Sequence, residues 1–341
     1  MNNSAKMLQD KTPSTNGNLC QSGLELWTKV SGVRSQADPF SCRPIWNLAF
    51  HEAYSPKRQI FIQGGLDGLA VMAEKHQPNG SSILTPVEPH WFFGSSMIGN
   101  RSLEAANDLI TSYLSENKHK LSAVVVSGVR PRSKGAHNLR NKFEDRFTLI
   151  KHSRKTLCAA SLKDGFDGYL SRRSSNTRKG LKKAYRKAES AEVYFERKCP
   201  NSAREVKSTF DRMIDVEMKS WKGAALGMAT GQPCAFYRTM MRKLTEEKQA
   251  RVIFAKIADQ DIGYIFGGVC EHVYRGQQFS FARSHEDLSL GNLLQAEKVR
   301  WLCEEKIERY DMGPITGRRM GYKAHWAEKR MHIETWMMKN V

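Results

Sequence analysis

Three short segments in the last third of the chain carry residue types that suit a transfer reaction on a phosphate-bearing donor. Ser284–Leu294 is a polar, glycine-containing loop that runs into a predicted helix. Backbone N–H groups at a helix start lack intrahelical partners, so they favour anions. Tyr310–Gly313 then places an acid at the end of a short predicted strand, and Gly321–Trp326 places Lys323 between aromatic residues. This order suits a site that holds the donor beside a polar acceptor.

Lys323 and Asp311 are the first two candidate catalytic residues. Lys323 follows Tyr322 and precedes two aromatic side chains, so we predict that it stabilises a developing oxyanion or holds donor phosphate, with Tyr322 beside it as a substrate-binding residue. The alternative is an ordinary surface lysine. Asp311 is predicted either to bind an acceptor amine or act as a base, or to serve only as a turn residue before Gly313.

The loop that precedes the predicted helix at Gly291 offers a general base. Histidine titrates near the working pH, and burial raises the pKa of a glutamate. His285 and Glu286 are therefore candidate bases, although an exposed polar loop is the alternative. The donor itself is expected on the backbone of Leu290, Gly291, Asn292 and Leu293.

A strongly basic helix is predicted to be capped by Ser174 or Ser175 and to run through Ala188. Arg178, Lys182 and Arg186 form one row at i, i+4 spacing. Residues 151–190 hold twelve Lys or Arg against three acids, a difference of nine charges. Neighbouring like charges repel, so anion binding is favoured over a merely solvated helix face.

Trp221 and Lys222 are further candidate substrate contacts. They end a predicted amphipathic helix over Arg204–Lys219 and precede a glycine-rich stretch, Gly223–Gly231, that is typical of a substrate loop. The alternative for Trp221 is a core position. Trp91–Phe93 is predicted to be a strand, followed by a turn through Ser96.

The composition limits the class of protein. The 341 residues carry a formal net charge of +19, which suggests an anionic partner such as tRNA, an acidic membrane surface or a phosphorylated substrate. The sequence shows neither a signal peptide nor an apolar run long enough for a membrane span, so a cytoplasmic location is expected. Seven scattered cysteines without a CxxC pair argue against a metal site.

Two α/β units are predicted after a disordered tail at residues 1–23. The first unit covers 24–150 and the second, with the chemistry, covers 151–341. Each is predicted as helices, a meander of strands, a helix and a further strand. The strands predicted in the second unit include 147–150, 156–160, 193–197, 250–257, 261–269, 273–283, 309–311 and 332–338.

Four stretches resemble the GNAT-fold acyltransferases, in the bacterial branch related to CelD-like proteins and the Fem aminoacyl transferases. They are Phe166–Leu170 with Ser174–Lys183, then Glu217–Gly223 with its SWKG, then Ile262–Ile265 through Leu290–Leu294, and finally Tyr310–Gly313 with Tyr322-Lys323. The resemblance covers about residues 150–330. It implies tandem GNAT-like domains, each with a mixed central sheet flanked by helices. It also implies an acceptor groove at the domain interface, which Trp91–Ser96 is expected to line unless that stretch is only a strand and a turn.

The resemblance also implies acyl transfer from acyl-CoA, or from an acyl carrier protein, to an amine or hydroxyl of a cell-envelope or biosynthetic acceptor. Only one glycine of the usual pyrophosphate loop is present, at Gly291. An aminoacyl-tRNA donor therefore stays open, as does a non-catalytic nucleic-acid or partner-binding protein on a decayed transferase fold. Binding of CoA, tRNA or neither separates the three.

Overall fold

The computed structural model describes residues 21–32, 36–116, 121–223, 227–315 and 320–340. Most of the predicted N-terminal tail lies outside these residues, and the first helix already begins at Gln21.

The helices are α1 (Gln21–Ser31), α2 (Pro44–Tyr54), α3 (Ser102–Glu116), α4 (Lys134–Phe143), α5 (Gly165–Ser171), α6 (Ser175–Ser190), α7 (Ala203–Met218), α8 (Gly231–Glu246), α9 (Leu290–Glu304) and α10 (Lys323–Trp326), with 3₁₀ turns η1 (Phe40–Cys42) and η2 (Arg283–Leu288).

Twelve described strands form one mixed sheet. They are β1 (Ile60–Gly65), β2 (Gly68–His76), β3 (Ser82–Thr85), β4 (Met97–Gly99), β5 (Leu121–Val129), β6 (Phe147–Ser161), β7 (Val193–Lys198), β8 (Ala250–Ile257), β9 (Gln260–Cys270), β10 (Val273–Phe281), β11 (Arg309–Pro314) and β12 (Lys329–Asn340). The order is β1-β2-β3-β5-β12-β6-β11-β10-β9-β8-β7, with β4 beside β2.

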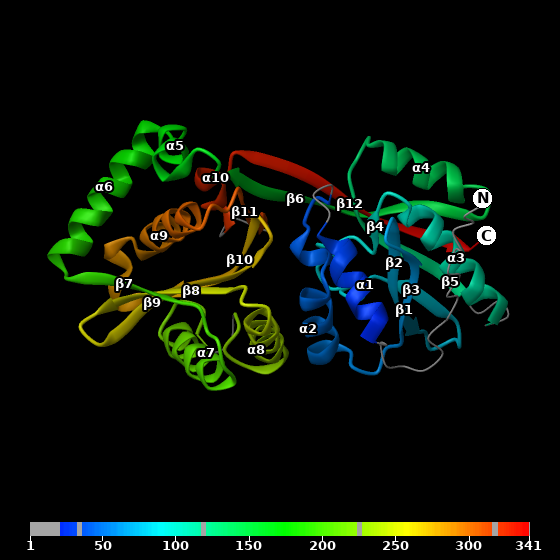
Figure 1. Cartoon of the computed structure of the whole chain (residues 1–341), viewed down its shortest axis with the longest axis horizontal. Coiled ribbons are helices and arrows are strands. Elements are labelled where there is room, and N and C mark those ends of the chain that lie inside the picture. The colour runs from blue at the N-terminus through cyan, green and yellow to red at the C-terminus, as the bar shows by residue number, and fades with distance from the viewer. Residues whose placement is uncertain (1–20, 33–35, 117–120, 224–226, 316–319, 341) are drawn as a thin grey trace, which may run out of the picture.

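Two lobes share this sheet, and the long strands β6 and β12 run through both (Figure 1). β12 pairs with β6 along its whole length and with β5 from Glu334 onward, so the last strand of the chain lies between two strands from the first half. The boundary expected between residues 150 and 151 lies inside β6. Segments 147–150 and 156–160, predicted as separate strands, belong to this one strand.

Helices cover both faces of the C-terminal lobe. Side chains alternate along β9, so neighbouring residues lie on opposite faces of the sheet. Ile265 packs in the core beneath α5, α6 and α9, whereas Tyr264 and Phe266 pack in the core beneath α7 and α8. The second core also includes Trp46 and Phe50 of α2, so the N-terminal half packs on the C-terminal lobe through α2 and α8.

Some predicted elements differ from the structure. The segment Trp91–Phe93 is not a strand but an irregular turn. The buried carboxylate of Glu88 accepts backbone hydrogen bonds there from His90 and from each of the next three residues, so a side chain replaces a strand partner. α1, α4 and α10 were not predicted. The mixed α/β class is confirmed.

Candidate active site

A small cavity opens where two parallel strands stop pairing. β10 and β11 are in register only from Val273 to Arg275, although β10 continues to Phe281. A β-bulge between Gly276 and Gln278 falls at the same place. The cavity measures about 80 Å³ and is lined by Lys222, Ile265, Phe266, Gly276, Gln277, Gln278, Phe279, Gln295, Tyr310, Met312, Met320, Tyr322 and Lys323.

Lys323 and Tyr322 stand at one wall of this cavity, at the start of α10. Lys323 is 8% exposed, and its Nζ donates to the carbonyl oxygen of Pro314 at 2.8 Å. Burial, together with the nearby charge of Arg275, lowers the pKa of Lys323 to about 7. The ring of Tyr322 packs edge-to-face on Phe279, with centroids 5.1 Å apart, and burial raises the pKa of its hydroxyl. Both predicted residues therefore face the cavity.

Lys222 reaches the cavity from the opposite side, just after α7. Its Nζ donates to the carbonyl of Phe279 at 2.8 Å and lies 3.4 Å from Oε1 of Glu217. Burial lowers the pKa of Lys222, while Glu217 acts in the opposite direction. Trp221, by contrast, is 43% exposed and does not line the cavity.

Glu217 is a residue that the sequence reasoning missed. It has no solvent exposure, and its Oε2 accepts a hydrogen bond from the Tyr264 hydroxyl at 2.8 Å. A charged group is costly to bury without partners, so Glu217 is held by Tyr264 and Lys222 together. The signal was available, since Glu217 falls four residues after Met213 on the apolar face of an amphipathic helix.

None of the predicted donor-loop residues lines the cavity, which α9 reaches through Gln295; the loop adjoins it only where Gly291 packs on Phe279. Ser289 precedes this helix in the left-handed region, at φ 57°, and its side chain makes no capping bond. The backbone N–H groups of Asn292 and Leu293 donate to the carbonyl of Ser289 at 2.9 and 3.3 Å, so these two predicted donor contacts are already paired. The N–H groups of Leu290 and Gly291 come first in the helix and have no side-chain cap from Ser289, which suits an anion. The side chains of Leu290 and Leu293 are buried, whereas Asn292 is exposed.

Gly291 packs close to two aromatic rings. A Cβ built at this position would lie 3.4 Å from a ring carbon of Phe279 and 3.4 Å from one of Phe281. The residue has ordinary helical geometry, so its lack of a side chain matters for space rather than for backbone conformation.

His285 and Glu286 lie in η2, outside the cavity. His285 is half-buried and its Nδ1 lies 2.9 Å from the Ser284 hydroxyl, while Glu286 is exposed. Neither residue lines the opening between β10 and β11.

Asp311 faces away from the cavity because neighbouring residues on a strand alternate, and Tyr310 and Met312 both line it. Its Oδ1 accepts from Arg309 Nε at 2.6 Å, and Oδ2 has no hydrogen-bond partner. Burial and the nearby Asp38 raise the pKa of Asp311 to about 7, against the effect of Arg309.

The glycine of the Asp-x-Gly segment has a packing role. Gly313 adopts φ +74°, and a Cβ there would collide with the guanidinium of Arg275. Arg275 is itself buried and ion-paired with Asp38 at 3.1 Å. Asp311 and Gly313 thus belong to a buried charge network on the far face of β11.

The basic helix α6 lies beside the donor loop. Ser174 caps it by accepting from the backbone of Thr177 at 3.1 Å, as predicted. Lys187 donates to the carbonyl of Asp287 at 3.0 Å, which ties α6 to η2. A groove of about 360 Å³ runs between them, lined by Lys183, Arg186, Lys187, Ser190, Ala191, Asp287 and Leu288.

The predicted cationic row is exposed along its length. Arg178, Lys182 and Arg186 all face solvent, and Arg178 also donates to the carbonyls of Ser171 and Arg173. The row therefore presents three solvent-facing cations, one of which also caps the preceding turn.

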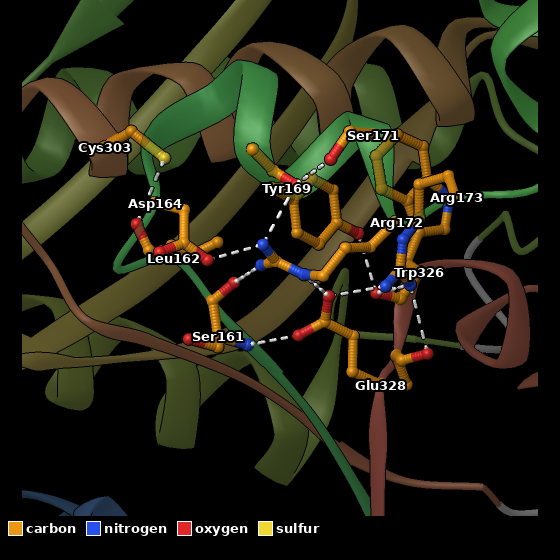
Figure 2. A network of polar contacts seen from close by, with 12 residues as sticks. Ser161, Leu162, Asp164, Tyr169, Ser171, Arg172, Arg173, Cys303, Trp326 and Glu328 are labelled. Atoms are coloured by element: carbon orange, nitrogen blue, oxygen red, sulfur yellow. Dashed lines mark hydrogen bonds and ion pairs between the residues drawn. The ribbon is translucent and has the colours of Figure 1, made fainter.

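A polar network fixes the far end of α10 (Figure 2). The carbonyl of Trp326 accepts from the Tyr169 hydroxyl at 2.6 Å and from Arg173 at 3.1 Å. Glu328 accepts from Arg172 at 2.7 Å and from Arg173 at 2.6 Å. Because α10 has only four residues, these contacts position Lys323 at its start.

Comparison with known proteins identifies the class of domain that carries this cavity. Residues 175–324, from α6 to α10, match the family model described as Acetyltransferase (GNAT) domain. These residues therefore form a GNAT-type transferase domain, and the GNAT resemblance predicted from the motifs is confirmed. No curated protein matches it.

Three solved structures share its fold. FemX is 11% identical, with a TM-score of 0.66, over 91% of this chain and 95% of that one. A conserved protein of unknown function from Bacteroides thetaiotaomicron is 11% identical, with a TM-score of 0.59, over 93% and 97%. The C-terminal domain of a proposed lysylphosphatidylglycerol synthetase from Agrobacterium fabrum is 11% identical, with a TM-score of 0.56, over 94% and 92%.

Membrane-spanning helices and metal-binding clusters are both absent from the described residues. None of the described helices is both long and apolar enough to span a membrane. Nor do the described residues include a group of three or more His, Cys, Asp or Glu side chains placed to hold a metal ion.

Proposed function

We propose that this protein transfers an acyl group from acyl-CoA, or from an acyl carrier protein, to an amine or hydroxyl of a cell-envelope or biosynthetic acceptor. The observation that carries the proposal is the juxtaposition of the cavity between β10 and β11 with the start of α9. The cavity brings together Lys222, Tyr322 and Lys323. At the nearby start of α9, the N–H groups of Leu290 and Gly291 have no side-chain cap from Ser289, which supports a donor-phosphate site there.

The proposed chemistry is direct attack of the acceptor on the donor carbonyl. The acceptor forms the new bond to carbon, the carbon–sulfur bond breaks, and the thiolate leaves with its electron pair. Lys323 in its charged form stabilises the oxyanion that develops. The bulge in β10 also leaves Gln277 without a register partner on β9. The backbone N–H of Gln277 is therefore a second candidate for a hydrogen bond to the oxyanion.

The acceptor's proton needs a base near the cavity. His285, Glu286 and Asp311 do not line it. Lys222 does, and burial lowers its pKa against the opposing effect of Glu217, which makes it a candidate proton acceptor. We therefore propose Lys222 as the base in preference to the three residues predicted from the sequence. We also propose that Tyr322 forms the wall that holds the substrate against Phe279.

A second candidate function is aminoacyl transfer from an aminoacyl-tRNA. The observation that favours it is the groove between α6 and η2, whose walls include Lys183, Arg186 and Lys187. Cations beside a donor loop attract a phosphate backbone. The fold likeness to FemX shows the fold alone at 11% identity, so it does not decide between donors.

The experiment that separates the two donors is a charge reversal on α6. Arg178, Lys182 and Arg186 are changed together to Glu, and binding of CoA and of tRNA is measured for the variant and the unmutated protein. If the donor is acyl-CoA, CoA binds the unmutated protein and its affinity changes little, because its phosphates sit at α9. The control reverses Arg204 and Lys207, which are exposed on α7, and changes the net charge by four units where the α6 variant changes it by six.

The contrary outcome is equally distinct. If tRNA shifts in native gels, loses that shift in the α6 variant but not in the control, and CoA does not bind, the acyl-CoA proposal is wrong. Salt dependence provides a second readout, since each phosphate that is neutralised releases a counterion and steepens the loss of affinity with salt.

A further inference from the structure

A second, larger cavity lies in the N-terminal lobe. It measures about 680 Å³ and sits between α4 and the strands β6 and β12, with walls formed by Pro131, Arg132, Ser133, Ala136, His137, Arg140, Lys151, Arg154, His332, Glu334 and Trp336. None of these residues lines the cavity between β10 and β11. The function proposed above does not use this place.

The walls are strongly cationic. Arg132, Arg140, Lys151 and Arg154 contribute four positive charges and Glu334 one negative charge, a difference of three with both histidines neutral. Glu334 is buried, lies 3.4 Å from Lys151 Nζ, and accepts from the Trp336 indole at 3.1 Å. Within the described part of the chain, the three arginines make no ion pair with an acid. Their mutual repulsion is therefore relieved only by solvent or by an anion.

The framework that holds these cations is well defined. Ser133 caps α4 by accepting from the backbone of Ala136 at 3.1 Å. The buried Trp336 ring forms the floor, with the Arg140 guanidinium 5.7 Å and the Lys151 ammonium 5.4 Å from its centroid. Each of these cations is thus held near one aromatic surface by a cation–π contact.

We propose that this cavity binds a small molecule that carries a diphosphate, or an equivalent group with two to three negative charges. The net charge of the walls matches such a group. Arginine forks bind phosphate oxygens in pairs, which surface lysines do not reproduce. The volume lies within the range of small-molecule sites, roughly 300–1,000 Å³, so it leaves room for an organic body beside the phosphates.

The test is direct binding of inorganic pyrophosphate and of ADP to the full chain, measured by calorimetry, with inorganic phosphate for comparison. We expect both to bind more tightly than phosphate. Arg140→Glu and Arg154→Glu should each weaken binding by about tenfold or more, since each removes a phosphate contact and adds repulsion. Lys142→Glu is the matched control, because Lys142 is exposed on the same helix but does not line the cavity.

Three results would overturn the proposal. One is the absence of pyrophosphate and ADP binding to the intact protein. Another is an equal loss in Lys142→Glu, which would show only a diffuse electrostatic field. The third is binding that Arg140→Glu leaves unchanged but Gly291→Val abolishes, which would place the phosphates at α9. Arg140→Gln, which adds no negative charge, keeps the test valid if the Glu variant does not fold.

Discussion

At the scale of single residues, Lys323 is the side chain on which the proposed chemistry depends most. Lys323→Ala should keep the fold and reduce turnover by about 10²-fold or more, the usual cost of losing one oxyanion donor. Activity is measured with whichever acyl donor the binding experiments identify, and folding is measured by thermal melting. An Ala variant with unchanged turnover would remove Lys323 from the mechanism.

The pH dependence of turnover gives the charge that Lys323 carries when it acts. Its pKa is about 7. If the ammonium stabilises the oxyanion, its contribution is present below pH 7 and is lost as pH rises through that value. Lys323→Arg should move this loss to higher pH, because arginine stays charged. A rate that instead rises through pH 7 and becomes flat in Lys323→Arg would assign Lys323 the role of a base.

Gly291 tests whether donor phosphate approaches the start of α9. Gly291→Ala adds a Cβ at ordinary contact distance from Phe279 and Phe281, so it should leave the melting temperature nearly unchanged. Gly291→Val adds two further carbons at the edge of the cavity and should weaken donor binding more than Ala does. Affinity per folded molecule is the measurement. Equal donor affinity in all three proteins would make Gly291 a packing residue only.

At the scale of elements, the contacts of β6 and α5 with the segment after α10 determine where Lys323 stands. Glu328 joins Arg172, Arg173 and the backbone of Ser161, whose N–H donates at 2.8 Å. Glu328→Gln keeps the shape but weakens charge-assisted hydrogen bonds, each of which contributes about 1.5–3 kcal/mol. We expect a lower melting temperature together with lower turnover.

The control for this element is Asp164→Asn. Asp164 pairs with Arg172 at 2.6 Å, but its side chain is 68% exposed, so its loss should cost little. If Glu328→Gln lowers the melting temperature but leaves turnover per folded molecule and its pH dependence unchanged, the network stabilises the fold without positioning Lys323.

At the scale of the whole molecule, β6 and β12 couple the two lobes. Phe147 begins β6 and is buried in the N-terminal core, whereas Ile150 on the same strand is 40% exposed. Phe147→Ala should cost about 3–5 kcal/mol, and Ile150→Ala much less. Because both lobes share these strands, calorimetry should show one transition that moves to lower temperature. A separate, unshifted transition for the C-terminal lobe would show that the lobes unfold independently.

The sequence by itself determined the class of the protein and much of its local structure. A capping serine predicted the start of α6 correctly, and the SWKG and Tyr-Lys motifs identified the GNAT resemblance that the family match confirmed. The strand predicted at Trp91–Phe93 was wrong. Aromatic residues favour strands, but here the buried carboxylate of Glu88 accepts backbone hydrogen bonds and holds the segment as a turn.

Only the tertiary structure decided which candidates share one cavity. Lys222 and Tyr322 are a hundred residues apart in sequence, yet both line the opening between β10 and β11, while Asp311 faces the other side. The alternation of side chains along the strand at Asp311 could be predicted from the sequence, but the face of the sheet on which the cavity opens could not. That face depends on where β10 and β11 stop pairing, and strand pairing is a long-range contact that no local pattern encodes.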